Sequence, residues 1–258
     1  MTVPTAAWGP ERLVEALADD ARDQRVAAVQ LGLGYSAVRL GGGEVGLAWT
    51  PKGGARCCQQ FAAAGTLAGR PAADLLARLA TGADPLDRLL GLATANALIA
   101  RRPPAPALPG GDLALLDLRP TDHLVMVGHF APLLPAIRAT GARLDIVENE
   151  PDAGELGPEA GRAALGRCTV AIVTATSLIT GGLADYLQAL GPARAVMLLG
   201  PSTPLLPEAF TGSRVTLLAG SRVHDRERAL QVVAEGGGTP ALRPSLTQVC
   251  LAVPAPAA

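Results

Sequence analysis

The chain has 258 residues, of which 49% are apolar and only 3% aromatic, so its core must consist largely of Ala, Leu and Val. The 22 Lys and Arg residues nearly balance the 23 Asp and Glu residues, and no basic stripe or polybasic run stands out. This composition argues against a nucleic-acid surface, which needs basic charge or aromatic stacking, and against a membrane-binding surface.

The expected location is a reducing cytoplasm. Four cysteines occur, at positions 57, 58, 168 and 250, and none forms a Cys-x-x-Cys pair. Residues 1–19 show neither the charged start nor the apolar stretch of a signal peptide. No apolar run reaches the length of a membrane span.

The first hundred residues predict a helix, a three-stranded meander and two further helices. Apolar residues recur at helical spacing in the helical segments, and glycine-rich turns separate the β-like runs, as hairpins require. The expected elements are helix 10–22, strands 26–31, 35–40 and 44–50, and helices 71–81 and 85–102.

A linker is expected at RRPPAPALPGG, residues 101–111, which is the densest Pro/Gly cluster inside the chain. Such a segment can neither continue a helix nor join the interior of a sheet. We therefore divide the chain into a first domain at 1–102, a linker at 103–112 and a second domain at 113–258. The tail VPAPAA is expected to fray.

The second domain alternates short apolar runs with helical patterns. Near-continuous apolar strands of this kind predict a parallel sheet covered on both faces, which is a doubly wound, Rossmann-like α/β fold. The expected strands are 124–127, 144–147, 170–173, 195–199 and 215–219, and the expected helices are 133–139, 160–165, 183–190 and 226–234.

Candidate ligand-binding residues follow these strands, because ligands of open α/β sheets bind outside the carboxyl ends of the strands. All five predicted exits carry small, hydroxyl-bearing or charged residues. The candidates are Gly128, His129, Phe130, Glu148, Thr174, Thr176, Thr180, Gly181, Gly200, Pro201, Ser202, Thr203 and Asp225.

Glu148 lies twenty residues after Gly128, where dinucleotide-binding folds place a carboxylate on the ribose hydroxyls. The loop GHFAPL, however, lacks the G-x-G-x-x-G pattern, and His129 and Phe130 would crowd a pyrophosphate. The alternative for Glu148 is a solvated or helix-capping carboxylate, and the sequence leaves both open.

The segment GPSTP, residues 200–204, predicts a helix start, with Ser202 or Thr203 as the cap and Pro204 in the first position. The N–H groups of such a loop suit an anion. Asp225 has the alternative role of capping the helix that begins at Arg226. Asn96, on an otherwise apolar helix, needs a partner, which we expect across the domain interface.

Cys57, His129 and His224 are the candidate metal ligands, since soft metals prefer thiolate and imidazole. Together with Glu148, these residues could form one metal site. However, no spacing pattern links them, and lone Cys and His residues are more often structural. No G-x-S-x-G elbow occurs, so catalytic residues stay unassigned.

Five motifs in order resemble a bacterial and archaeal family of poorly characterised proteins that is labelled with heavy-metal chelation: MVGHFAPLLPAI, IVENEP, VAIVTATSLITGGLADYL, LLGPSTPLLPEAF and LLAGSRVHD. GLAWT and LLGLATANALIA resemble the family's first domain. The resemblance implies an enolase-N-terminal-like α+β domain joined to a Rossmann-like domain, with a site in the cleft between them. The family tends to carry Asn-Gly-Thr where this chain has Thr180, Gly181 and Gly182.

Three functions stay open: a small-molecule binder that handles a metal chelate or anionic metabolite, an enzyme acting on an anionic or nucleotide-like substrate, and a regulatory or scaffold module with a vestigial site. The cofactor is unknown, with a metal ion or metal chelate as the candidate. We expect a chelate rather than a bare ion, because the strand exits offer hydroxyls, glycine N–H groups and a carboxylate. Whether the chain is an enzyme or a homo-oligomer stays open.

Overall fold

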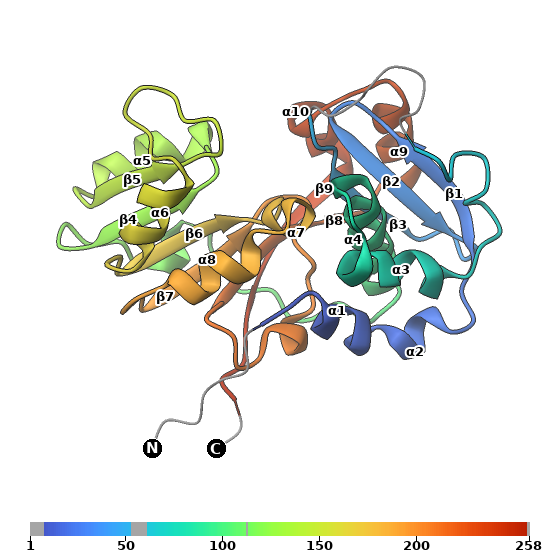
Figure 1. Cartoon of the computed structure of the whole chain (residues 1–258), viewed down its shortest axis with the longest axis horizontal. Coiled ribbons are helices and arrows are strands. Elements are labelled where there is room, and N and C mark those ends of the chain that lie inside the picture. The colour runs from blue at the N-terminus through green and yellow to red at the C-terminus, as the bar shows by residue number, and fades with distance from the viewer. Residues whose placement is uncertain (1–7, 53–60, 112, 257–258) are drawn as a thin grey trace.

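The computed structural model describes residues 8–52, 61–111 and 113–256. They form a three-stranded antiparallel sheet and a six-stranded, mostly parallel sheet, with helices packed on both (Figure 1). The mixed α/β class predicted from the sequence is therefore confirmed. No helix in this part of the chain is both long and apolar enough to cross a membrane.

The small sheet is a meander of β1 (Val26–Leu31), β2 (Tyr35–Leu40) and β3 (Val45–Trp49), with β2 in the middle. The predicted first helix is interrupted at Leu17, which separates α1 from α2. The helices that accompany this sheet are α1 (Glu11–Ala16), α2 (Ala18–Ala21), α3 (Ala72–Thr81) and α4 (Pro85–Ile99).

Both faces of the small sheet are buried, because its residues alternate between two clusters. Val38 and Leu40 pack in the cluster that contains the leucines of α4, whereas Tyr35 and Ala37 pack with α9 (Arg226–Ala234). Figure 1 shows α9 and α10 (Thr239–Leu242) beside β1 and β2. A helix from the second half of the chain thus covers the sheet of the first half.

The large sheet has the strand order β5-β4-β6-β7-β8-β9. The first five strands are parallel, and β9 runs antiparallel to β8 at the edge. The strands are β4 (His123–Val127), β5 (Arg143–Val147), β6 (Val170–Thr174), β7 (Ala195–Leu199), β8 (Leu217–Val223) and β9 (Leu246–Ala252).

Alternate residues of the large sheet enter opposite faces, and both faces are covered. In β4, Leu124 and Met126 pack with Ile137 of α5, whereas Val125 and Val127 pack with Leu165 of α6. This explains the near-continuous apolar runs and confirms the doubly wound arrangement. The remaining helices and 3-10 turns are α5 (Leu134–Ala139), α6 (Pro158–Leu165), α7 (Ser177–Thr180), α8 (Leu183–Ala189), η1 (Ala114–Leu116), η2 (Ala131–Leu133), η3 (Pro207–Phe210) and η4 (Arg243–Ser245).

The predicted end of the fifth strand is wrong. It was expected at Ala219, but β8 continues to Val223 because β9 pairs with it residue by residue, from Leu217↔Ala252 to Val223↔Leu246. Residues 220–222 therefore belong to a strand and not to an exit loop. The sequence pattern did not predict β9. The only expectation for the end of the chain concerned the tail after β9, VPAPAA, which was expected to fray.

The open edge of β3 is covered by the loop after β7. Alternation in an antiparallel sheet directs the backbone groups of every second residue outward. At this edge, the Leu47 carbonyl accepts from the Asn96 amide at 2.9 Å, and the Trp49 N–H donates to Ser202 Oγ at 2.9 Å. Asn96 also donates to the Ser202 carbonyl at 3.1 Å. The expectation that Asn96 bonds across the interface is confirmed.

The linker packs against the large sheet. The Leu108 N–H donates to the Cys250 carbonyl of β9 at 2.8 Å, and the Arg222 guanidinium of β8 donates to the Ala105 carbonyl at 3.0 Å. Near the start of the chain, Trp8 stacks on Phe210 with ring centroids 4.9 Å apart. The predicted linker thus lies between the two sheets in the sequence. In the folded chain, several contacts connect the half before the linker with the half after it.

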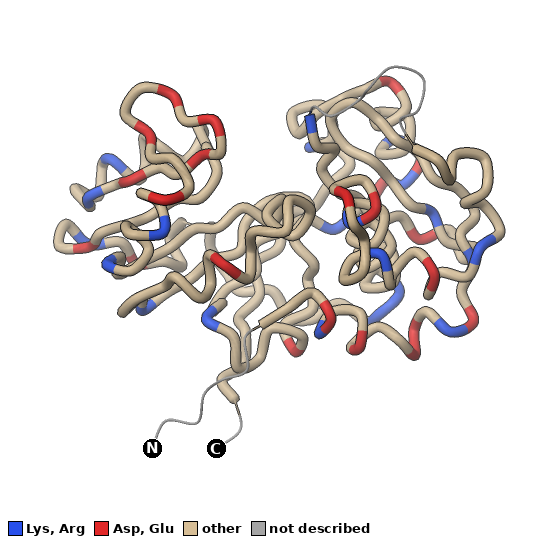
Figure 2. The backbone as a smooth tube through the Cα atoms, viewed as in Figure 1, with Lys and Arg blue, Asp and Glu red and all other residues tan. Residues whose placement is uncertain are grey.

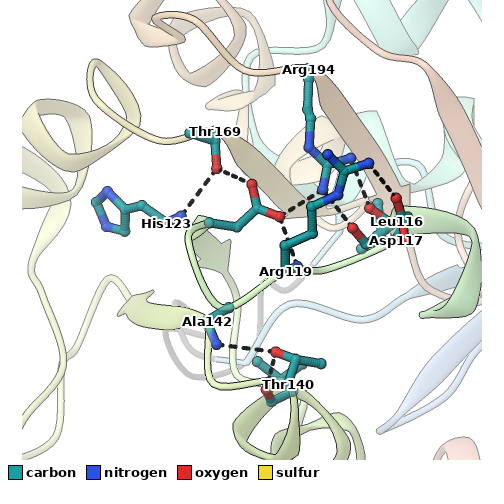
Figure 3. Close-up of polar contacts among 10 residues, drawn as sticks. Leu116, Asp117, Arg119, His123, Thr140, Ala142, Thr169 and Arg194 are labelled. Carbon is teal, nitrogen blue, oxygen red and sulfur yellow. Dashed lines mark hydrogen bonds and ion pairs between the residues drawn. The ribbon is translucent and has the colours of Figure 1, made fainter.

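A buried carboxylate network closes the amino-terminal end of the parallel sheet. Asp122 accepts from Arg194 at 2.6 Å, from Thr169 Oγ1 at 2.7 Å and from the Arg119 N–H at 2.9 Å. Arg194 also donates to the carbonyls of Leu116 and Asp117 (Figure 3). The Arg194 guanidinium is the largest cause that holds the pKa of Asp122 at about 2, below its ordinary 3.8.

This network predicts a loss of stability in acid. Because the folded pKa of Asp122 is depressed, its stabilisation is present above pH 4 and is lost as the pH falls from 3.8 towards 2. Between pH 5 and pH 3, the wild type should lose about 1 kcal/mol of unfolding free energy that Asp122→Asn does not lose, measured by urea denaturation. Asp117→Asn is the control, since the Asp117 side chain is 70% exposed. Equal acid sensitivity in wild type and Asp122→Asn would contradict the assignment.

The interface predicts a second stability effect. Asn96→Ala leaves the Ser202 carbonyl without the Asn96 donor, so it should lower the unfolding free energy by about 1–3 kcal/mol in urea denaturation. Thr94→Val is the matched control, because the Thr94 hydroxyl, as far as the described residues go, bonds to Leu90 of its own helix alone. If both variants lower the unfolding free energy by the same amount, the Asn96 bonds add nothing specific to the docking of the two sheets.

Candidate functional site

The GPSTP loop does not start a helix. Gly200 has a φ of 129°, a backbone conformation that favours glycine, and the next helical turn is η3, which begins at Pro207. Ser202 and Thr203 are 1% and 2% exposed. Thr203 Oγ1 donates to the Ala219 carbonyl at 3.0 Å. The predicted capping role of these hydroxyls is therefore wrong, because they hold the loop against β3 and β8.

The exit of β6 makes a second contact with the first half of the chain. Arg88 of α4 donates to the Ile179 carbonyl of α7 at 2.6 Å. Gly181, with a φ of 85°, ends α7, and a Cβ there would lie 3.9 Å from the Arg88 guanidinium. Thr180 and Gly181 are exposed at this junction.

Gly128 and two threonines meet where β4 and β6 end side by side. This is the topological switch point of the sheet, because β5 lies on one side of β4 and β6 on the other. Gly128 has a φ of 95°, and a Cβ there would lie 2.9 Å from Thr174 Cβ. Thr174 Oγ1 lies 3.0 Å from Thr176 Oγ1. The structure thus brings these three predicted residues together.

Glu148 and His129 also meet. Glu148 Oε1 accepts from the His129 N–H at 2.6 Å, and the His129 ring bonds to Glu155 at 2.6 Å. The Asp152 N–H and His129 hold the pKa of Glu155 below its ordinary value. Burial raises the pKa of Tyr186, and the nearby Glu148 charge raises it further. Figure 2 shows acidic residues gathered on this loop after β5.

Sequence reasoning missed Glu155 and Tyr186 as neighbours of Glu148. Glu155 belongs to the same acid-rich segment, ENEPDAGE, which was the available signal. Glu155 lies near His129 because the next residue, Leu156, pairs with the end of β5 in a parallel bridge to Val147. There the Leu156 N–H donates to the Ile146 carbonyl at 2.8 Å. No sequence pattern indicates that Tyr186 lies near the end of β5.

The other candidates take separate roles, although the Phe130 ring stays near Gly128, 3.4 Å from where a Cβ there would lie. Phe130 packs on the apolar cluster of the opposite sheet face. Asp225 accepts from the Arg228 N–H at 3.1 Å, so its alternative role as the cap of α9 is confirmed. It also borders an open groove of about 580 Å³ between β1 and α9, which is lined by residues of both charges. His224 is exposed, and its N–H donates to the Ser245 carbonyl.

The candidate metal ligands do not form a centre in the part of the chain that the structure describes. Within it, no group of three or more His, Cys, Asp or Glu side chains could hold a metal ion. Cys57 lies outside the described residues. The described donor set therefore does not fit a bare heavy-metal ion, which prefers several thiolate or imidazole ligands.

A cavity of about 300 Å³ lies between the two sheets, at the carboxyl ends of β7 and β8. Leu47 and Asn96 line it from the first half of the chain, and Pro201, Thr203 and Arg222 from the second. Glu148 is not among its lining residues. The prediction that Glu148 contributes to ligand binding stays a prediction.

Arg222 distinguishes this cavity, and it was not a sequence candidate. It is half-buried on β8, and the one hydrogen bond of its guanidinium among the described residues goes to the Ala105 carbonyl. Burial lowers the pKa of Arg222. Arg102, at the rim, is paired with Asp20 and Glu208, each at 2.6 Å.

Comparison with solved structures gives two relatives of the same fold, both of unknown function. A protein from Pyrococcus horikoshii shares 19% identity at a TM-score of 0.83, over 95% of this chain and 99% of that one. A protein from Desulfitobacterium hafniense DCB-2 shares 24% identity at a TM-score of 0.79, over 95% of this chain and 98% of that one. Comparison with curated proteins gave no match.

Two family models match the sequence, and both carry the description "Putative heavy-metal chelation". One matches residues 14–99 and the other residues 112–252. Because the second match spans more than half of the 258 residues, the chain belongs to the DUF364 family, which has that description and to which both structural relatives are assigned.

Proposed function

We propose that the protein binds a small organic molecule in the cavity between its two sheets. The observation that carries this proposal is the cavity itself, about 300 Å³ in volume and lined by both halves of the chain at strand carboxyl ends. Ligand pockets favour such junctions, and this volume is at the small end of their usual range, which begins at about 300 Å³. The family description adds small-molecule or metal binding as the general class.

Binding is better supported than catalysis at this place. The Thr203 hydroxyl donates to the Ala219 carbonyl, and the Ser202 hydroxyl accepts from the Trp49 N–H. Both are buried in the docking contact, so neither is positioned as an activated nucleophile, which needs an adjacent base. We therefore favour a binder over an enzyme that acts on an anionic substrate.

A heavy metal would enter this cavity as a chelate. The groups around it include the Arg222 guanidinium, the Ser221 hydroxyl and backbone groups, which match the oxygens of an organic ligand and not a soft cation. The organic ligand then supplies the metal's coordination, and the protein recognises the complex from outside.

Titration with free Zn²⁺, Cu²⁺ and Ni²⁺ tests the bare-ion alternative. We expect no stoichiometric, tight binding that depends on His129, because its ring is bonded to Glu155 and no group of three potential ligands gathers among the described residues. The measurement is calorimetric titration of wild type and His129→Ala, with elemental analysis of the purified protein. Tight one-to-one binding that is lost in His129→Ala, or in Cys57→Ala, would overturn this view.

Blocking the cavity tests the proposal itself. Ser221 lines the cavity on β8, so Ser221→Trp should displace any small molecule that co-purifies with the wild type, as detected by native mass spectrometry. Gln248→Trp is the matched control, because Gln248 pairs with Ser221 in the ladder but is exposed and outside the cavity lining. A bound molecule retained equally in Ser221→Trp would place the site elsewhere.

A further inference from the structure

We infer that the cavity between the sheets selects a small anion, a carboxylate or phosphate-type oxyanion, whose charge pairs with Arg222. This inference rests on the proposed function and names its ligand class. It departs from the reading of the family description as bare-metal binding, because a guanidinium without a carboxylate partner in the wall repels a free metal ion and attracts an anionic chelate.

The first support is the charge balance around the cavity. Three charged residues line it, namely Arg102, Glu208 and Arg222. Arg102 and Glu208 pair with each other at 2.6 Å, and Arg102 also pairs with Asp20. Arg222 has no carboxylate partner among the described residues, so its guanidinium is the one charged group of the described lining that is not in an ion pair.

The second support is the hydrogen-bonding capacity of Arg222. A guanidinium has five N–H donors in a planar arrangement that suits two oxygens of a carboxylate or phosphate. One donor of Arg222 bonds to the Ala105 carbonyl of the linker at 3.0 Å. The others have no acceptor in the described part of the chain. Burial lowers the pKa of this group.

The third support is the rest of the wall, which offers further polar groups. Ser221 lines the cavity, and its hydroxyl makes no hydrogen bond with another described residue. Val45 also lines the cavity, and alternation along β3 directs its backbone N–H to the same open edge as Trp49. An oxyanion can thus bond to Arg222 with its charge and to these groups with its remaining oxygens.

The fourth support is the size of the space. A volume of about 300 Å³ is at the lower limit of ligand pockets, which favours a small acid or a compact chelate over a dinucleotide. This agrees with the missing G-x-G-x-x-G pattern in the sequence.

The test uses the full chain and the probes phosphate, sulfate, citrate and nickel citrate, with NaCl keeping the ionic strength constant. In the wild type, at least one anion should raise the melting temperature saturably and give a one-to-one calorimetric isotherm. Arg222→Met should lose this response by at least about tenfold in Kd, which is about 1.4 kcal/mol. Arg228→Met, at an exposed arginine outside the cavity, should keep it. No saturable anion response in the wild type, or an equal response in Arg222→Met, would overturn the inference.

Arg222→Lys guards against a folding defect in the Met variant. It keeps the charge and loses the planar pair of donors, so it should bind the same anion more weakly than wild type and more tightly than Arg222→Met. If Arg222→Lys binds the anion as poorly as Arg222→Met, the planar donors of the guanidinium are required. If it binds the anion as tightly as the wild type, the positive charge alone is sufficient. An Arg222→Lys variant that folds and binds the anion more weakly than Arg222→Met would overturn the inference.

The outcomes separate this inference from the proposed function. An uncharged co-purifying molecule that is lost in Ser221→Trp but retained in Arg222→Met would leave the binding function standing and remove the anion. A wild type that holds no molecule of any charge, and whose response to all probes is unchanged by Ser221→Trp, would remove both.

Discussion

The open edge of β3 is the constraint on which the arrangement of the two sheets depends. An exposed strand edge carries backbone groups that need partners. Here the Leu47 carbonyl and the Trp49 N–H find them in Asn96 and Ser202, which come from a helix of the first half and a loop of the second. One carboxamide, bonded to both Leu47 and Ser202, therefore fixes the distance between the sheets. The cavity is the part of this edge, around Val45, that the loop does not fill.

This docking explains why glycine, proline and hydroxyls gather in GPSTP. Gly200 turns the chain out of β7, and the two hydroxyls satisfy backbone groups of β3 and β8. The same residue types would suit a ligand-binding loop, because a loop that bonds to a strand edge and a loop that bonds to a ligand face the same requirement for donors and acceptors. Pro201 and Thr203 show that the loop also borders the cavity.

The sequence was sufficient for the features that depend on local pattern. Glycine-rich turns predicted the meander, and apolar runs predicted the buried parallel strands. The position of Asn96 on an otherwise apolar helix predicted that its amide bonds across the interface, but not to which residue. Features that depend on distant pairing could not be predicted. β9 is half-exposed and precedes a proline-rich tail, so its pairing with β8 left little periodic signal. Without β9, residues 220–222 were placed in a loop, and Arg222 was not recognised as a cavity residue.

A crystal structure of the protein, purified without added ligand, tests the central claim most directly. The account predicts difference density for a small, oxygen-rich molecule in the cavity, within hydrogen-bonding distance of the Arg222 guanidinium and beside Asn96. Density for a bound molecule at Gly128, Glu148 and Thr174 instead, with the cavity between the sheets holding water alone, would contradict it and move the function to the switch point of the parallel sheet.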